Sequence, residues 1–156
     1  MLYTTFELCH KSGACVESYR KLATALGGVT EYGKQTPIPL TKVLEVCGLD
    51  DAIWALRCTT TPSDNVVTEF ACRCAEHVLH YYEDKYPNDK RPRQAIEAAR
   101  VCVTDKSPAA RDAAGDAAWA AWAARAAGDA AWDAGAARAA ETQYQTEQFV
   151  ALLGGK

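Results

Sequence analysis

The sequence predicts an all-α protein: a compact domain of several helices, with a long alanine-rich helix or a helical hairpin towards its C-terminus. Three observations favour this fold class. Runs of alternating β-branched and polar residues, typical of half-buried strands, are absent. Glycine, proline and capping residues recur where helices would begin and end. The segment 109–140 consists mainly of alanine, the strongest helix former.

Length and composition are those of one ordinary domain. The chain has 156 residues, of which 49% are hydrophobic, enough to build one core. We expect a single domain over residues 1–156, with a helical part at 1–106 and an alanine- and tryptophan-rich part at 107–153. The formal charge of −3 is too small to favour nucleic acid or an anionic membrane as a partner.

The sequence also predicts where the protein resides. No stretch approaches the ~20 apolar residues that a membrane-spanning helix needs. Residues 1–7 carry neither a basic leader nor an apolar run, so no export signal is expected. The seven cysteines of a chain without such a signal are expected to be reduced thiols. These features together predict a cytoplasmic protein.

The first part of the chain is predicted to form short helices separated by glycine and proline. They are expected at 4–11, 15–26, 41–47 and 50–58. Gly27-Gly28 and Gly48 end the second and third, and Asp50 is placed to cap the fourth. The segment 29–40, which contains Pro37 and Pro39, is expected to be a loop.

The best-defined helix is expected at 64–86, ended by Pro87. At 100° per residue its apolar side chains fall on one side: Val67, Phe70, Ala71, Cys74, Ala75, Val78, Leu79 and Tyr82. Among these we expect four to be nearly inaccessible: Phe70, Cys74, Val78 and Leu79.

A second helix is expected after it, capped by Asp89, with Pro92 in its first turn, and running to Val103. Its arginines, Arg93 and Arg100, are expected to pair with Glu97 or with acidic residues of the preceding helix.

Alanine dominates the segment 109–140, which follows a capping serine and a proline at 107–108. Alanine fills 19 of its 32 positions, and GDAAWAAWAARAA at 115–127 is repeated as GDAAWDAGAARAA at 128–140. We favour one helix ~48 Å long over a hairpin broken at Gly128, because alanine and glycine then line one face. Such a face allows another helix to approach closely, within the chain or in a homodimer. The tail is expected to continue as helix until Gly154.

The usual short catalytic motifs are absent, including phosphate loops, dinucleotide-binding loops and zinc-protease motifs. Cys72, Cys74, His77 and His80 have the closest spacing to a metal site. On a helix the two cysteines point about 160° apart, so the four cannot surround one ion. Cys9 adjoins His10, but sequence neighbours on a helix splay apart and form no dyad. We therefore expect no catalytic residue, no metal and no cofactor.

Three blocks of the chain carry a family likeness. They are LDDAIWALR at 49–57, FACRCAEHVLHYYEDKYPNDKRPRQAIEAAR at 70–100, and the Ala/Trp/Arg/Asp-rich stretch after Ser107. Through them the chain resembles the immunity proteins found beside bacterial polymorphic toxins and in many phage and prophage genomes. The resemblance implies a mostly α-helical, cytoplasmic protein that binds and neutralises a toxin. Carriage by phages adds a second target class, a bacterial defence enzyme such as a CRISPR effector.

The expected function is therefore inhibition by binding a protein, such as a toxin or a nuclease, without direct contact with nucleic acid or membrane. Tryptophan and arginine are enriched at interface hot spots. The candidate partner-binding residues are Glu69, Arg73, Glu76, His77, His80, Arg91, Arg93, Arg100, Trp119, Trp122, Arg125 and Trp132. The tryptophans could instead pack inside the chain, supplying bulk that alanine lacks. A small metal- or thiol-dependent enzyme centred on 69–80 is the alternative from another functional class.

Overall fold

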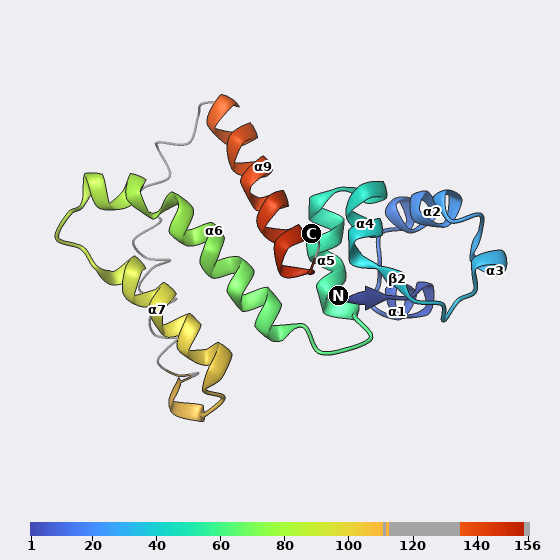
Figure 1. Cartoon of the computed structure of the whole chain (residues 1–156), viewed down its shortest axis with the longest axis horizontal. Coiled ribbons are helices and arrows are strands. Elements are labelled where there is room, and N and C mark those ends of the chain that lie inside the picture. The colour runs from blue at the N-terminus through green and yellow to red at the C-terminus, as the bar shows by residue number, and fades with distance from the viewer. Residues whose placement is uncertain (111, 113–134, 155–156) are drawn as a thin grey trace. The chain divides into compact units, whose positions relative to one another are not determined.

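The structure, a computed structural model, describes residues 1–110, 112 and 135–154. The described part is mostly helical, which confirms the predicted fold class (Figure 1). The choice between a long helix and a hairpin at 109–140 depends mainly on residues outside this part. The same is true of four candidate binding residues, Trp119, Trp122, Arg125 and Trp132.

Contacts within the chain divide it into two compact units. Unit 1 comprises Met1–Ser63 together with Phe149–Lys156, and unit 2 comprises Asp64–Gln148. Helix α9, Gly135–Leu152, contributes to both, because the boundary between the units falls before Phe149. The single domain over 1–156 stays a prediction.

Unit 1 combines short helices with one pair of very short strands. Strands β1 (Tyr3–Thr4) and β2 (Ile38–Pro39) pair antiparallel. The sequence did not predict them, because two residues are too few for an alternating pattern to show. The helices of this unit are α1 (Phe6–Lys11), α2 (Val16–Ala25), α3 (Val29–Tyr32), α4 (Leu40–Cys47), α5 (Leu49–Ala55) and the 3-10 helix η1 (Leu56–Cys58).

Two predictions for unit 1 are wrong. Residues 29–40 are not one loop, since they contain α3, β2 and the first residue of α4. Asp50 does not cap α5, because Gly48 occupies the capping position and Asp50 lies in the first turn. Gly48 has a φ of 97°, in the left-handed region that favours glycine. One residue therefore ends α4, as predicted, and also begins α5.

The core of unit 1 centres on Phe6, which is fully buried. Its ring meets Tyr19 and Tyr32 edge-on, with ring centroids 5.3 and 5.9 Å away. Thr5 caps α1 by accepting a hydrogen bond from the Leu8 backbone N–H. The other buried apolar residues of this unit are Cys9, Leu22, Ile38, Leu40, Val43, Ala52, Ala55, Leu56, Cys58, Phe149 and Leu153.

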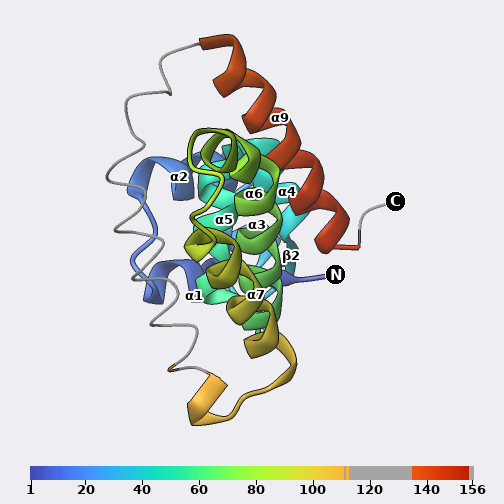
Figure 2. The ribbon, with the colours of Figure 1, turned by 90° about the vertical axis from the view of Figure 1, so that its left-hand side faces the viewer.

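Unit 2 is built on α6 (Asp64–Lys85), with α7 (Arg91–Thr104) folded back beside it in both ribbon views (Figures 1 and 2). Cys72, Leu79 and Ile96 form a buried cluster between the two helices. The Asp89 carboxylate accepts a hydrogen bond from the Arg91 backbone N–H at 3.1 Å, although Lys90 is the formal capping residue. Pro92 lies in the first turn of α7, as predicted.

The predicted inward face of α6 is only partly correct. Phe70 and Leu79 are buried, whereas Cys74 and Val78 are half-buried. Val67, which the sequence placed on the same face, is exposed.

The reason is that α6 is contacted on two sides within unit 2. Helix α7 covers the side that carries Cys72, which is only 3% exposed. The unit 2 part of α9 meets another side, through Arg73 and His77. A helix with two neighbours buries parts of two faces, so one apolar stripe does not define its interior.

The helix ends around the alanine-rich segment follow the prediction where they are described. The Ser107 hydroxyl accepts a hydrogen bond from the Ala110 backbone N–H at 3.2 Å, and helical residues begin at Pro108. Helix α9 ends at Leu152, and Gly154 follows with a φ of 77°. Both predicted signals, a serine–proline start and a glycine stop, are confirmed.

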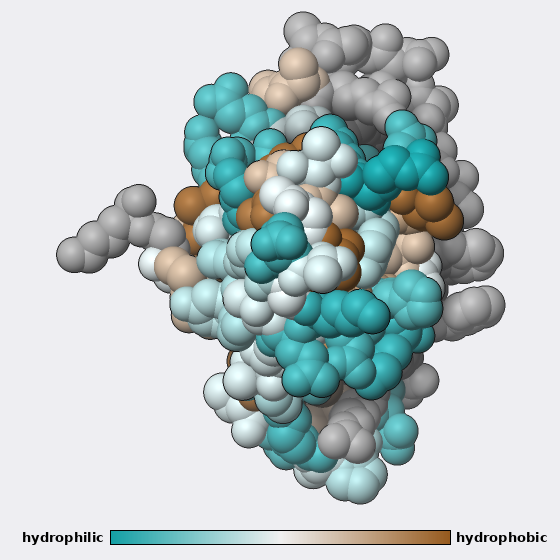
Figure 3. Space-filling model, turned by 90° about the vertical axis from the view of Figure 1, so that its right-hand side faces the viewer, coloured by the Kyte–Doolittle hydropathy of each residue, from teal (hydrophilic) through white to brown (hydrophobic). Residues whose placement is uncertain are grey.

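The surface of the described residues is polar, with scattered apolar residues. On the face drawn in Figure 3, hydrophobic residues form separate patches among hydrophilic ones. The large hydrophobic residues that are exposed in the described part are Met1, Val16, Val67, Tyr81 and Val101. Scattered residues of this kind are normal on a protein surface and do not mark a binding site. Within the described ranges, no helix has both the length and the apolar character needed to cross a bilayer.

Candidate functional site

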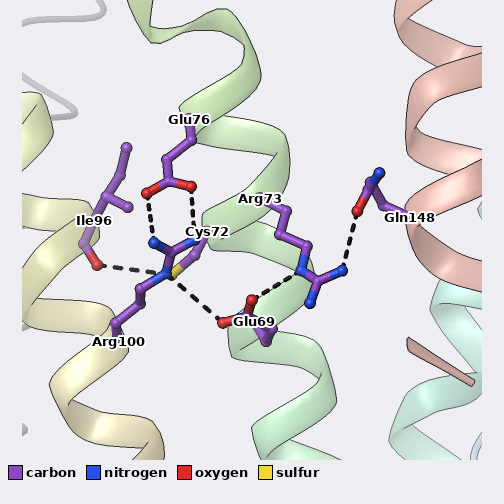
Figure 4. A network of polar contacts seen from close by, with 7 residues as sticks. All are labelled: Glu69, Cys72, Arg73, Glu76, Ile96, Arg100 and Gln148. Carbon is purple, nitrogen blue, oxygen red and sulfur yellow. Dashed lines mark hydrogen bonds and ion pairs between the residues drawn. The ribbon is translucent and has the colours of Figure 1, made fainter. Parts of the chain in front are cut away.

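A network of charged and polar side chains links α6 to its two neighbours in unit 2 (Figure 4). On the α7 side, Arg100 forms a two-pronged ion pair with Glu76, with Nη1–Oε1 and Nη2–Oε2 both at 2.6 Å. Its Nε lies 3.7 Å from Oε2 of Glu69. The guanidinium plane matches a carboxylate in this geometry, so the pair links α7 to α6.

On the other side, Arg73 connects α6 to α9. Its Nε donates to Oε1 of Glu69 at 2.8 Å, and its Nη1 donates to Oε1 of Gln148 at 3.1 Å (Figure 4). Glu69 is thus shared by Arg73 and Arg100, which come from different helices. One carboxylate on α6 therefore contacts an arginine of α6 and an arginine of α7, and Arg73 extends the network to α9.

His77 anchors a second contact between α6 and α9. Its Nδ1 lies 2.7 Å from Oε2 of Glu141, and its ring stacks on Tyr144 with centroids 3.6 Å apart and planes 9° from parallel. The other oxygen of Glu141 accepts from Nε2 of Gln145 at 2.8 Å. Glu141 is a buried carboxylate with both oxygens engaged. Burial raises the pKa of the Cys74 thiol to about 11, and the charge of the Glu141 carboxylate contributes to this rise.

The turn between α6 and α7 carries further ion pairs. Arg93 forms a two-pronged pair with Glu83, at 2.8 and 2.6 Å. Asp89 accepts from the Tyr82 hydroxyl at 2.7 Å and from Nε and Nη2 of Arg91 at 2.8 and 2.5 Å. The Arg91 guanidinium holds the pKa of Asp89 well below its usual range. An open hollow of about 700 Å³ lies here, lined by residues 85–91 and Gln94.

The structure thus places eight of the candidate residues in unit 2. Glu69, Arg73, Glu76 and Arg100 form one network, and His77 lies beside it. His80 is exposed, and its Nδ1 lies 3.0 Å from the backbone oxygen of His77. Arg91 and Arg93 lie apart from them at the α6–α7 turn. Arg93 and Arg100 pair with acidic residues of the preceding helix, one of the two predicted arrangements.

Sequence reasoning missed the residues of α9 that complete the network. Glu141, Tyr144 and Gln148 are three and four residues apart, so they share one side of a helix. That spacing was visible in the sequence. It was uninformative alone, because polar residues at helical spacing usually form a solvated face. Only the position of α9 turns Glu141 into a buried partner of His77.

Removing this buried carboxylate should destabilise the protein. Glu141→Ala leaves His77 and Gln145 without their acceptor, so we expect the free energy of unfolding to fall by ~1–3 kcal/mol. Urea denaturation followed by circular dichroism measures the change. Glu147→Ala is the matched control, because Glu147 is exposed on the same helix. Equal effects of the two substitutions would contradict a structural role for the His77–Glu141 contact.

The region that contains this network matches a known protein family. The sequence model of the family described as "Imm-5 like putative immunity protein" matches residues 57–144, more than half of the chain. The chain belongs to this family. No curated protein and no solved structure matches the chain. The resemblance to immunity proteins noted from the sequence is confirmed.

Membership of the Imm-5 like immunity family indicates an immunity-type role, with a protein toxin as the general class of partner. The matched range includes all of α6 and α7 and the residues of α9 up to Tyr144. It therefore covers the network of unit 2 except Gln148. The block at 49–57 lies outside it apart from Arg57.

Proposed function

We propose that this protein is an inhibitor that neutralises a toxin or a nuclease by binding it directly. The observation that carries the proposal is the family match over residues 57–144. The lack of short catalytic motifs in the sequence agrees with a binding role. The partner is a protein, and neither nucleic acid nor a membrane is contacted directly.

We propose the charged α6–α7 face of unit 2 as the binding surface. Here the pairs Glu76–Arg100, Glu83–Arg93 and Asp89–Arg91 are partly exposed. Exposed ion pairs contribute only ~0–1 kcal/mol to stability, so these side chains can exchange partners at little cost to the fold. A face with ordered charges of both signs suits a protein surface of complementary pattern, because such patterns set specificity and association rate.

Co-expression with the product of the neighbouring toxin gene, followed by pull-down and a growth assay, tests the function. We expect the toxin to be retained on the inhibitor and its toxicity to be suppressed. A CRISPR effector or another host defence nuclease in place of the toxin tests the phage-encoded alternative, an anti-defence inhibitor. If none of these proteins is bound and none is neutralised, the proposal is wrong.

Charge reversal tests the binding surface separately from the fold. We expect Arg93→Glu and Arg100→Glu, combined, to weaken the Kd for the identified partner at least ~10-fold, while the melting temperature changes by only a few degrees. Arg20→Glu is the matched control, because Arg20 is exposed and lies outside the family-matched range. An unchanged Kd for the double variant would exclude this face.

The enzyme alternative and the homodimer are tested by separate measurements. Stoichiometric zinc or iron in protein purified without a histidine tag would favour a metal enzyme. One cysteine reacting far faster than the other six would favour a thiol enzyme. Light scattering at two concentrations distinguishes a monomer from a homodimer formed through the alanine-rich face. None of these outcomes is required by the proposed inhibitor.

A further inference from the structure

Two cysteines that are far apart in the sequence meet in the core of unit 1. Cys9 lies on α1 and Cys58 ends η1, and both are free thiols, 5% and 4% exposed. The Thr4 hydroxyl oxygen lies 3.3 Å from Sγ of Cys9 and 3.6 Å from Sγ of Cys58. The two sulfurs therefore flank one oxygen atom in a buried polar cluster.

The backbone holds this cluster in place. The Thr4 hydroxyl donates its only proton to the Cys58 carbonyl at 2.7 Å, so it faces the sulfurs as an acceptor. Strand β1 pairs with β2 on one side, and the Tyr3 carbonyl accepts a hydrogen bond from the Thr60 backbone N–H at 2.8 Å. These contacts fix the segment that follows Cys58 beside the segment that leads into α1.

The two thiols differ in acidity. The neighbouring Cys58 thiol, with burial, raises the pKa of Cys9. Interaction with the Cys9 thiol lowers the pKa of Cys58, and the nearby Arg57 charge acts in the same direction. These directions favour Cys58 as the sulfur that loses its proton first and Cys9 as the one that keeps it, which are the two roles that disulfide formation needs.

The other cysteines have different surroundings. Cys47, Cys72 and Cys102 each donate a hydrogen bond to a backbone carbonyl, of Ser18, Ile96 and Ala110. Cys58 donates one as well, to the Ala55 carbonyl at 3.4 Å, in addition to its contact with Thr4. Cys15 is exposed at the start of α2. The shared Thr4 hydroxyl thus sets Cys9 and Cys58 apart as a chemical pair.

We propose that Cys9 and Cys58 are a peroxide-sensitive pair that closes into an internal disulfide. The Cys58 thiolate attacks one oxygen of hydrogen peroxide; an S–O bond forms, the O–O bond breaks, and hydroxide leaves and takes up a proton. The Cys9 sulfur then attacks the sulfenic sulfur of Cys58. The S–S bond forms, and the sulfenic oxygen departs as water with the Cys9 proton. Each sulfur is oxidised by one electron, and both peroxide oxygens end in water.

Peroxide is the oxidant we name because it is barely larger than water, and both residues keep a few per cent of their surface exposed. The chain also allows the product to be identified without ambiguity. Trypsin releases Cys9 in the fragment 1–11 but leaves Cys58 and Cys72 together in 58–73. A second protease that cleaves before Asp64 separates them, so a link between 1–11 and 58–63 identifies the pair.

The test treats the reduced, full-length protein with hydrogen peroxide, blocks the remaining thiols and maps its peptides without reduction. We expect the 1–11/58–63 link to be the main linked product, to revert with a thiol reductant and to be lost in Cys58→Ser. Cys102→Ser is the matched control and should retain the link. The proposal fails if Cys9 and Cys58 stay free at a dose that oxidises Cys15, or if they gain oxygen without becoming linked.

Discussion

Replacing Phe6 with alanine should lower the free energy of unfolding by about 3–5 kcal/mol, the usual cost of removing a fully buried aromatic side chain. Phe6 has no exposed surface and makes T-shaped ring contacts with Tyr19 and Tyr32. Edge-on aromatic pairs add ~0.5–1.5 kcal/mol beyond the area they bury, so two such contacts place the loss towards the upper end. The cavity would also adjoin α1, which begins at this residue.

Urea denaturation at equilibrium measures this loss. Tyr81→Ala is the control, because Tyr81 is 60% exposed and its removal leaves no cavity. We expect the control to change stability by less than ~1 kcal/mol. A loss below ~1 kcal/mol for Phe6→Ala as well would show that Phe6 is not a central core residue.

The second large effect is expected at Leu79, in the core of unit 2. Leu79→Ala should cost about 2–5 kcal/mol, because the side chain is 7% exposed and belongs to the cluster with Cys72 and Ile96. Val67→Ala on the same helix is the control, since Val67 is 43% exposed. If the control lost as much stability as Leu79→Ala, the assignment of the buried face of α6 would be incorrect.

Together these two variants examine the prediction of a single domain. In a single cooperative domain, Phe6→Ala and Leu79→Ala shift the same unfolding transition. Hydrogen exchange of amides in α4 and α6 reports on the two units separately. Faster exchange confined to the unit that carries the substitution would indicate two units that unfold independently.

The positions of most described helices could be predicted because their ends depend on a few neighbouring residues. Gly48 stops α4, Pro92 lies in the first turn of α7, and Ser107 caps the next helical residues, each through a backbone constraint that acts over one turn. The two strands could not be predicted in this way. Thr4 lies opposite Ile38 through pairing across more than thirty residues, and neither strand is long enough to show a pattern.

In the candidate site, too, some residues could be identified from the sequence and others could not. The charged residues of α6 and α7 were identifiable, and a pairing of Arg100 with the preceding helix was one of two predicted arrangements. The importance of Glu141 was not identifiable, because its burial depends on α9 contacting α6 at His77.

The cysteines illustrate the point most clearly. Their number and their place on helices were evident from the sequence, and Cys74 was predicted to be nearly inaccessible because it lies on the apolar side of α6. In the structure Cys74 is half-buried and Cys72 is buried, since α7 covers the side that carries Cys72. It also brings Cys9 and Cys58 to one threonine hydroxyl.

The sequence by itself determined the all-α class, most of the helix boundaries and the family, because propensities, caps and motif blocks act within a few residues of one another. Tertiary structure alone decided which face of α6 is buried, which carboxylate meets His77 and which thiols are neighbours. Those properties depend on contacts between residues tens of positions apart, and no local sequence pattern indicates such contacts.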